Sequence, residues 1–137
     1  MTASAPAPAA STAPEHNKRI AQEFFSLAFN DKRPAEAAAR YLGPFYIQHN
    51  PGAPDGPEAF VSVITGFVEQ FPELTMEFKR VVAEGDLVVL HSHMRTSPED
   101  RGSSVMDIVR FEDGRIVEHW DVVQAVPETA ANDNSMF

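Results

Sequence analysis

Hydrophobic residues recur at helical spacing in the first third of the chain. Ile20, Phe24 and Leu27 lie three or four residues apart, which predicts an amphipathic helix over about residues 14–29. A second, shorter helix is expected over residues 34–41, where a proline precedes a run rich in alanine. Both segments should bury one apolar face.

A third helix is predicted to end near Pro72. Asp55 and Glu58 have the spacing of an N-terminal capping box, and an apolar stripe follows them at helical intervals. The stripe consists of Phe60, Ile64, Phe67, Val68 and Phe71. Before this helix, residues 45–51 should form a short extended stretch that runs into a proline-rich loop.

From Leu74 onward the pattern changes to an alternation of apolar and polar residues. A turn is expected at residues 84–86, and Asp113–Gly114 marks a tight connection. The four predicted strands cover residues 74–82, 87–95, 105–111 and 115–124. Helices followed by an antiparallel meander predict an α+β fold, in which three helices cover one face of a curved sheet of about four strands and enclose a pocket.

Composition sets the limits of this single domain, which we expect over residues 14–126. The first 13 residues are nearly all Ala, Pro, Ser and Thr and are expected to form a flexible tail, and residues 127–137 a second, irregular tail. The first tail lacks the basic and apolar regions of a signal peptide, although the remnant of a processed export segment could look similar. We therefore expect a cytoplasmic protein, with a processed exported form as the alternative.

Charge narrows the choice of partners. The formal net charge is −9, which disfavours nucleic acid and anionic membrane surfaces and favours a small neutral or cationic ligand. No apolar run approaches the about 20 residues that a membrane-spanning helix needs. The chain has no cysteine, which excludes disulfides, thiolate nucleophiles and cysteine-ligated metals.

Ionisable residues interrupt the predicted strands at alternating positions. His91 and His93, then Asp107, and then His119 and Asp121 have the period-two spacing that sends side chains to one face of a sheet. Ionisable groups on a face that should be apolar need a partner or a function. We therefore expect the functional site on this face.

The register of the last hairpin decides which of these side chains meet. A three-residue loop over residues 112–114 places Asp107 opposite His119, whereas a two-residue turn would place Trp120 beside Asp107. We favour the three-residue loop because it brings opposite charges together on one face. If the preceding hairpin pairs symmetrically, His93 lies opposite Asp107, and His93, Asp107 and His119 form one row across three strands.

Three segments resemble the SnoaL-like polyketide cyclase branch of the nuclear transport factor 2-like superfamily. They are residues 46–51, 106–111 and 113–122, and the order of elements agrees over about residues 15–126. The resemblance implies an α+β cone with a deep pocket, usually a homodimer. It also implies an intramolecular aldol closure without metal or organic cofactor, in which an acidic residue on the last strand is the acid/base. Asp121 occupies the matching place.

A more distant resemblance is to ketosteroid isomerase. That enzyme carries an aspartic acid two residues before an aromatic residue and three before an Arg-Phe pair, and this acid, in its protonated form, donates a hydrogen bond to an oxyanion. Residues 107–111 are similar to this segment, except that Val109 replaces the aromatic residue. A convincing counterpart of the isomerase's base is missing, so steroid isomerisation is not expected.

The residues are also consistent with acid/base chemistry by themselves. Abstraction of a proton next to a carbonyl group needs a base and a donor for the enolate oxygen, in a site that excludes water. We expect Asp121 to be the base, and His119 or Asp107 to supply a proton or hold the oxyanion, in an aldol-type cyclisation or an isomerisation. Further residues expected to contact the substrate are His49, His93, His91, Tyr46 and Trp120.

Three other interpretations remain open. An Asp–His pair across two strands can be purely structural, and Tyr46 and Trp120 can serve packing alone. A metal site for zinc, nickel or iron could be formed by His91, His93, His119 and Asp107. The chain could also be a non-catalytic module that binds a small ligand, because the superfamily includes scaffolds whose pocket only holds a ligand or partner.

Overall fold

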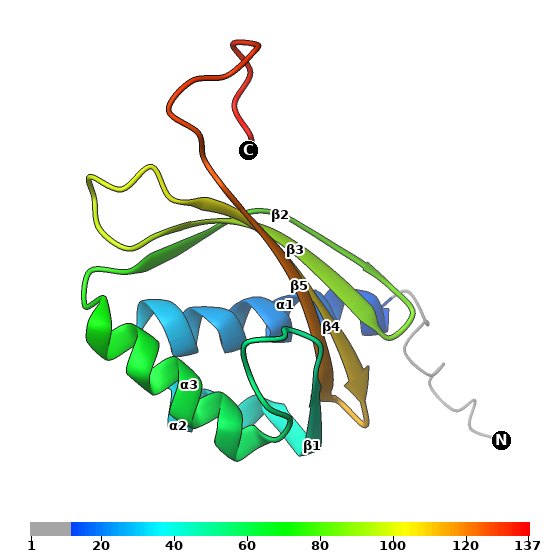
Figure 1. Ribbon diagram of the computed structural model, residues 1–137. Helices are drawn as coiled ribbons and strands as arrows, with labels where there is room; N and C mark the ends of the chain where they lie inside the picture. Colours follow the sequence, from blue (N-terminus) through cyan, green and yellow to red (C-terminus); the bar gives the residue numbers. More distant parts are fainter. Residues whose placement is uncertain (1–11) are drawn as a thin grey trace, which may run out of the picture.

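The computed structural model describes residues 12–137 (Figure 1). Within these residues three α-helices pack against one face of a five-stranded mixed sheet with the strand order β1-β5-β4-β3-β2. The predicted α+β architecture is therefore confirmed. The flexible tail predicted for residues 1–13 lies almost entirely outside the described residues.

The helices and strands follow the expected order. The helices are α1 (Thr12–Phe25), continued by the π-helical turn η1 (Ser26–Asn30), α2 (Pro34–Tyr41) and α3 (Pro57–Gln70). The strands are β1 (Leu42–Gln48), β2 (Thr75–Glu84), β3 (Leu87–Arg95), β4 (Ser103–Glu112) and β5 (Arg115–Ala125). No helix among residues 12–137 combines the length and the apolar character needed to cross a membrane.

The short extended stretch of the sequence is the fifth strand of the sheet. β1 pairs in parallel with β5, with Gln48 beside His119, so the sheet is not the purely antiparallel meander that the sequence predicted. Gly43 permits the close approach, because a Cβ atom there would lie 2.7 Å from Cγ1 of Val117. The end of β1 is thereby placed directly beside the polar positions of β5.

The hairpin between β4 and β5 has a two-residue turn, so the predicted three-residue loop is wrong. Asp113 and Gly114 have positive φ angles of 54° and 78°, as in a type I′ turn, whose twist matches that of the flanking strands. Glu112 and Arg115 pair directly next to the turn.

A β-bulge then shifts the pairing of these two strands by one further residue. Val117 is an extra residue on β5, and beyond it Asp107 pairs with Asp121, and Val109 with His119. The predicted pairing of Asp107 with His119 is therefore wrong by two residues. Because two residues is the period of a strand, Asp107, His119 and Asp121 nevertheless share one face.

The pairing of β3 with β4 differs from the predicted symmetrical pairing by an odd number of residues. His93 pairs with Ser104, and Leu90 is the residue opposite Asp107. An odd shift exchanges the two faces of a strand. His91 and His93 therefore point to the outer face of the sheet, and the predicted row through His93, Asp107 and His119 does not form.

The core lies between the helices and the inner face of the sheet. Its largest fully buried side chains include Phe24, Leu74, Leu90 and Ile116. The end of the first helix is tied to β2, because the side chain of Asn30 accepts a hydrogen bond from the backbone N–H of Met76 (2.8 Å) and donates one to its carbonyl (2.9 Å).

Candidate active site

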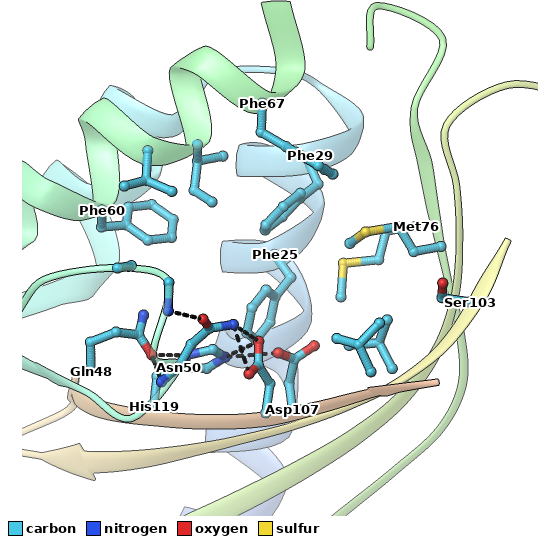
Figure 2. Close-up of a pocket in the computed structure, with 18 of the residues that line it drawn as sticks. Phe25, Phe29, Gln48, Asn50, Phe60, Phe67, Met76, Ser103, Asp107 and His119 are labelled. Atoms are coloured by element: carbon cyan, nitrogen blue, oxygen red, sulfur yellow. Dashed lines mark hydrogen bonds and ion pairs between the residues drawn. The ribbon is translucent and has the colours of Figure 1, made fainter. Parts of the chain in front are cut away.

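A cavity of about 710 Å³ lies between the helices and the inner face of the sheet (Figure 2). Its apolar lining comes mainly from Phe25, Phe29, Phe60, Ile64, Phe67, Met76, Met94 and Val105. In Figure 2 the labelled phenylalanines lie on the helical side, whereas the polar side chains gather next to the sheet. Mostly apolar cavities of this size with a few convergent polar groups are typical of small-molecule sites.

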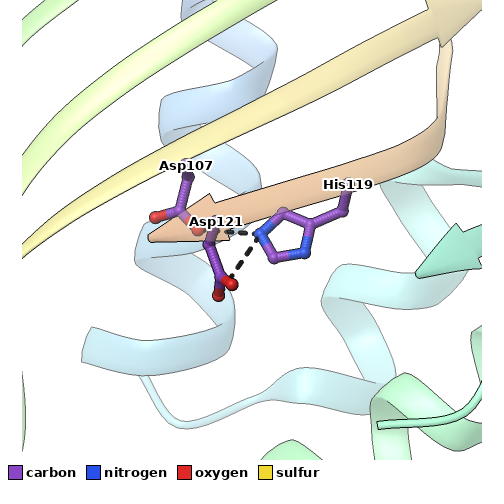
Figure 3. A group of neighbouring side chains, drawn as sticks. All are labelled: Asp107, His119 and Asp121. Atoms are coloured by element: carbon purple, nitrogen blue, oxygen red, sulfur yellow. Dashed lines mark hydrogen bonds and ion pairs between the residues drawn. The ribbon is translucent and has the colours of Figure 1, made fainter. Parts of the chain in front are cut away.

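Asp107, His119 and Asp121 meet at the polar end of this cavity (Figure 3). Nε2 of His119 lies 2.7 Å from Oδ1 of Asp107 and 4.0 Å from Oδ2 of Asp121. Asp107 comes from the middle of β4, and the other two residues come from successive inward positions of β5. The structure thus brings together the three residues that the sequence singled out for catalysis.

Asp107 is the most deeply buried of the three, with an exposed fraction of 4%. Burial raises the pKa of its carboxyl group, and the nearby charge of Asp121 acts in the same direction, whereas the hydrogen bond with His119 and the charge of His119 lower it. Oδ2 is buried and has no hydrogen-bond partner within residues 12–137. The net effect is a pKa of Asp107 above the usual value of an aspartic acid.

Gln48, at the end of β1, holds the other side of the imidazole ring. Its Oε1 lies 2.8 Å from Nδ1 of His119 and also accepts the backbone N–H of Asn50 at 3.0 Å. The backbone N–H of Gln48 donates to Oδ1 of Asp55 at 2.7 Å. Asp55 therefore supports the site and does not cap the third helix as predicted, since the N-cap of α3 is Gly56.

Asn50 holds the carboxylate of Asp121. Its Nδ2 lies 3.0 and 3.1 Å from the two carboxylate oxygens, and its Oδ1 accepts the backbone N–H of Gly52 at 2.7 Å. Because the Gly52 N–H can only donate, the orientation of the Asn50 amide is fixed. Asp121 is the most accessible of the three acid/base residues, with 15% of its side chain exposed.

Tyr46 lines the cavity, as the sequence predicted for a residue in contact with substrate. Its ring stacks on that of His119 at 6.2 Å with an interplanar angle of 18°, and Phe25 lies 6.0 Å from the same imidazole ring. Burial, with the charge of Asp107 as the second cause, raises the pKa of the Tyr46 phenol. The phenol therefore stays protonated.

His49 and Trp120 lie outside the cavity, so their predicted contact with substrate is wrong. Their rings stack on the outer face of the sheet at 4.7 Å and 5°. His49 also forms a hydrogen bond of 2.7 Å with Glu118, which helps to hold the pKa of that carboxyl group below its usual value. For Trp120 the alternation of side chains along β5 explains the error, because Trp120 lies between the inward residues His119 and Asp121 and therefore points outward.

His91 and His93 are also on the outer face. His91 contacts Arg80 and Ser104, and His93 donates a hydrogen bond from Nε2 to the carbonyl of Arg101 at 2.8 Å. The ring of Phe137 stacks on both imidazoles, at 5.7 and 4.0 Å. The predicted metal set of His91, His93, His119 and Asp107 is therefore split between two faces and does not form.

A different set of three residues could approach a metal ion. Asp107, His119 and Asp121 offer ligand atoms that all lie within 4.8 Å of one another. However, Nε2 of His119 and Oδ1 of Asp107 are separated by only 2.7 Å, which is the distance of a charge-assisted hydrogen bond and short for two ligands of one tetrahedral ion. The donor set fits a shared proton better than a metal.

Comparison with known proteins identifies relatives of this chain. Residues 21–119 match the model of the SnoaL-like domain. A search of curated proteins found no match. The structure of TsrD from Streptomyces laurentii is similar with a TM-score of 0.66 and 24% identity, over 80% of this chain and 88% of that one.

Two further solved structures are similar. Wild-type IdmH from Streptomyces antibioticus, described as a candidate polyketide cyclase, has a TM-score of 0.62 and 25% identity, over 76% of this chain and 91% of its own. An epoxide hydrolase of the LEH-like type from M. tuberculosis has a TM-score of 0.63 and 16% identity, over 82% of this chain and 85% of its own. These neighbours share the fold of this chain.

Proposed function

Because the chain belongs to the SnoaL-like domain family, as its sequence predicted, we propose that it is an enzyme that transfers a proton next to a carbonyl group of a small molecule. The reaction is an aldol-type ring closure or an isomerisation. It needs no cofactor, because SnoaL-like proteins generally work without one. One observation carries the proposal. Asp107, His119 and Asp121 converge at the polar end of an otherwise apolar cavity.

Asp121 is the base in this proposal. Its carboxylate borders the cavity and is aligned by two hydrogen bonds from Asn50, so a substrate C–H bond can approach it from the cavity side. Removal of the α-proton leaves the electron pair on the substrate as an enolate. The apolar walls exclude water, which would otherwise compete for the charges that develop.

The hydrogen-bonded pair of Asp107 and His119 is the acid. In a ring closure the enolate carbon attacks a second carbonyl carbon, a C–C bond forms, the C–O π bond breaks, and the resulting alkoxide takes the proton held by the pair. The 4.0 Å between Oδ2 of Asp121 and Nε2 of His119 exceeds hydrogen-bond distance, so the cycle closes through solvent: after the product leaves, Asp121 releases its proton to water and the pair takes one up. In an isomerisation the pair instead stabilises the enolate oxygen, and Asp121 returns its proton to a different carbon.

The lining also limits the substrate. Among residues 12–137 the ionisable groups that line the cavity are Asp100, Asp107, Asp121, His119 and the phenol of Tyr46, without any lysine or arginine. An anionic substrate would be repelled and would find no counter-ion. The proposed substrate is therefore a neutral or cationic, largely apolar carbonyl compound.

The outer face of the sheet is the proposed surface of a homodimer. Met106 and Val122 are exposed there to 43% and 71%, and Leu87 adds to the same face. Exposed apolar residues on the open face of a small sheet favour self-association. Sedimentation velocity should show a dimer at micromolar concentration, and a monomer that persists at high concentration would contradict this part.

Exchange of α-hydrogens with solvent deuterium tests the reaction without knowledge of the natural substrate. NMR would follow deuterium uptake into a panel of neutral cyclic and aromatic ketones. We expect uptake with the wild type and a loss of at least about 100-fold in Asp121→Asn. The matched control is Asp133→Asn, the same change at an exposed position of the C-terminal segment, which should not alter the rate. Equal rates in the wild type and Asp121→Asn, or no uptake into any compound, would overturn the proposal.

Elemental analysis of untagged protein separates this proposal from the alternatives. A metal bound in near-stoichiometric amount and required for exchange would favour a metal centre at Asp107, His119 and Asp121. Binding of the ketones without any exchange would favour a non-catalytic binding module.

A further inference from the structure

Gln48 determines where hydrogen atoms lie in the site. Two groups contact its Oε1, namely Nδ1 of His119 at 2.8 Å and the backbone N–H of Asn50 at 3.0 Å. A backbone N–H can only donate, so the atom it contacts must be the carbonyl oxygen of the Gln48 amide and not its nitrogen. The assignment of the amide therefore follows from the geometry.

The same oxygen fixes the protonation of one imidazole nitrogen. A carbonyl oxygen cannot donate, so Nδ1 of His119 must carry the hydrogen of this contact. In a neutral imidazole the other nitrogen, Nε2, is then without a hydrogen. Nε2 faces Oδ1 of Asp107 at 2.7 Å, and a hydrogen bond there requires one further proton, held by either atom.

We propose that Gln48 is a positioning residue, which keeps the Nδ1–H form of His119 and thereby makes the contact between His119 and Asp107 a store of one mobile proton. Without Gln48, the neutral ring could carry its hydrogen on Nε2 and donate it to an ionised Asp107. In that form Nε2–H donates to the carboxylate of Asp107, and neither group carries a further proton that it can release. The pair would then hold one proton fewer than the acid step needs. The catalytic meaning of this inference rests on the proposed function, but the hydrogen positions do not.

The surroundings of the pair support this assignment. Oδ2 of Asp107 is buried without a partner among the described residues, which is tolerated better by a neutral carboxyl group than by a carboxylate. Gln48 is itself anchored, because its backbone N–H donates to Asp55. Rotation of its amide by half a turn would place an NH₂ group against the backbone N–H of Asn50, which can only donate, so the reversed orientation is disfavoured.

Nitrogen-15 NMR of the histidine rings is the test. Long-range ¹H–¹⁵N spectra show which ring nitrogen carries hydrogen, and the signals of His119 are those that disappear in His119→Gln. In the wild type we expect Nδ1 of His119 to be protonated at every pH at which the protein is folded. A wild-type spectrum with bare Nδ1 would overturn the inference without any variant.

Two variants at position 48 sharpen the test. Gln48→Glu keeps an acceptor at Nδ1 and should keep Nδ1 protonated, whereas Gln48→Leu removes the acceptor and should move the hydrogen of the neutral ring to Nε2. Deuterium uptake should fall at least about tenfold in Gln48→Leu, with an altered pH profile, and Gln48→Glu should recover part of it. An Nδ1 signal that is unchanged in Gln48→Leu would refute the role of Gln48.

The two proposals fail in different ways. Absence of deuterium uptake in every protein, with the expected tautomer in the wild type, would reject the proposed reaction and leave the role of Gln48 in place. Full uptake by the wild type with bare Nδ1 would do the reverse. Circular dichroism of each variant shows whether a lost signal reflects unfolding.

Discussion

Replacement of Gly102 by alanine should destabilise the protein far more than the same change at Gly114. Both glycines have a φ of 78°, so alanine is disfavoured at either position by about 1–2 kcal/mol. A Cβ atom at Gly114 would meet nothing within 4 Å. At Gly102 it would lie 2.3 Å from the carbonyl oxygen of Met94 and 2.8 Å from Nε2 of His93. This oxygen cannot move aside without disturbing the end of β3, where Met94 pairs with Ser103 of β4, and this adds about 1–3 kcal/mol.

The pair of glycines therefore separates backbone conformation from packing. From urea denaturation followed by circular dichroism, we expect the free energy of unfolding to fall by about 1 kcal/mol in Gly114→Ala and by about 3 kcal/mol in Gly102→Ala. Equal losses would refute the packing argument. No loss in either variant would refute the left-handed backbone at both positions.

Three further predictions concern the site and the outer face. The raised pKa of Asp107 means that the folded state binds the proton of this carboxyl group more tightly than the unfolded state does. Between about pH 4 and the folded pKa, the contribution of Asp107 to stability therefore falls as pH rises. Asp107→Asn should lose this pH dependence, and parallel curves of stability against pH for the two proteins, from urea unfolding at pH 4–8, would contradict the prediction. Asn50→Leu removes both hydrogen bonds to Asp121 and should slow deuterium uptake about 10- to 100-fold with the fold retained, so an unchanged rate would exclude a positioning role. Deletion of Phe137 should shift the NMR signals of the His93 ring on which it stacks but leave uptake unchanged, and a lost activity would link the outer face to the cavity.

Local alternation in the sequence was enough to place His119 and Asp121 on the same face of the sheet. His119 and Asp121 are two residues apart on one strand, so they had to share a face whatever the register. The predicted register itself was wrong. Asp113–Gly114 is typical of a two-residue type I′ turn, but the pairing of opposite charges favoured the longer loop, and the bulge at Val117 leaves no clear mark in the sequence. Asp107 shares this face only because the two-residue turn and the bulge each shift the pairing of β4 and β5 by one residue, and two residues are one strand period.

The same reasoning failed for the histidines of β3. The length of the loop before β4 does not fix how the two strands pair, and a displacement by three residues sent His91 and His93 outward. Alternation within a strand is a local property, whereas the face that it presents to the core depends on pairing with a neighbour. His49 and Trp120 failed for a related reason, since they occupy outward positions next to inward ones.

Gln48 and Asn50 were missed although a signal was present. Tyr46, Gln48 and Asn50 alternate in the sequence, which is the period of a strand. The sequence predicts this segment only as a short extended stretch and not as a strand of the sheet, because its partner, β5, lies some 70 residues away and pairs with it in parallel. A long-range parallel pairing leaves no local turn for the sequence to reveal.

The pH dependence of deuterium uptake tests the division between base and acid most directly. We expect the wild-type rate to follow a bell-shaped curve, in which the acidic limb reports protonation of the base and the alkaline limb reports loss of the proton shared by Asp107 and His119. Asp107→Asn should remove or displace the alkaline limb while the acidic limb remains. A wild-type profile without an alkaline limb, or one that Asp107→Asn leaves unchanged, would contradict a proton store at this pair.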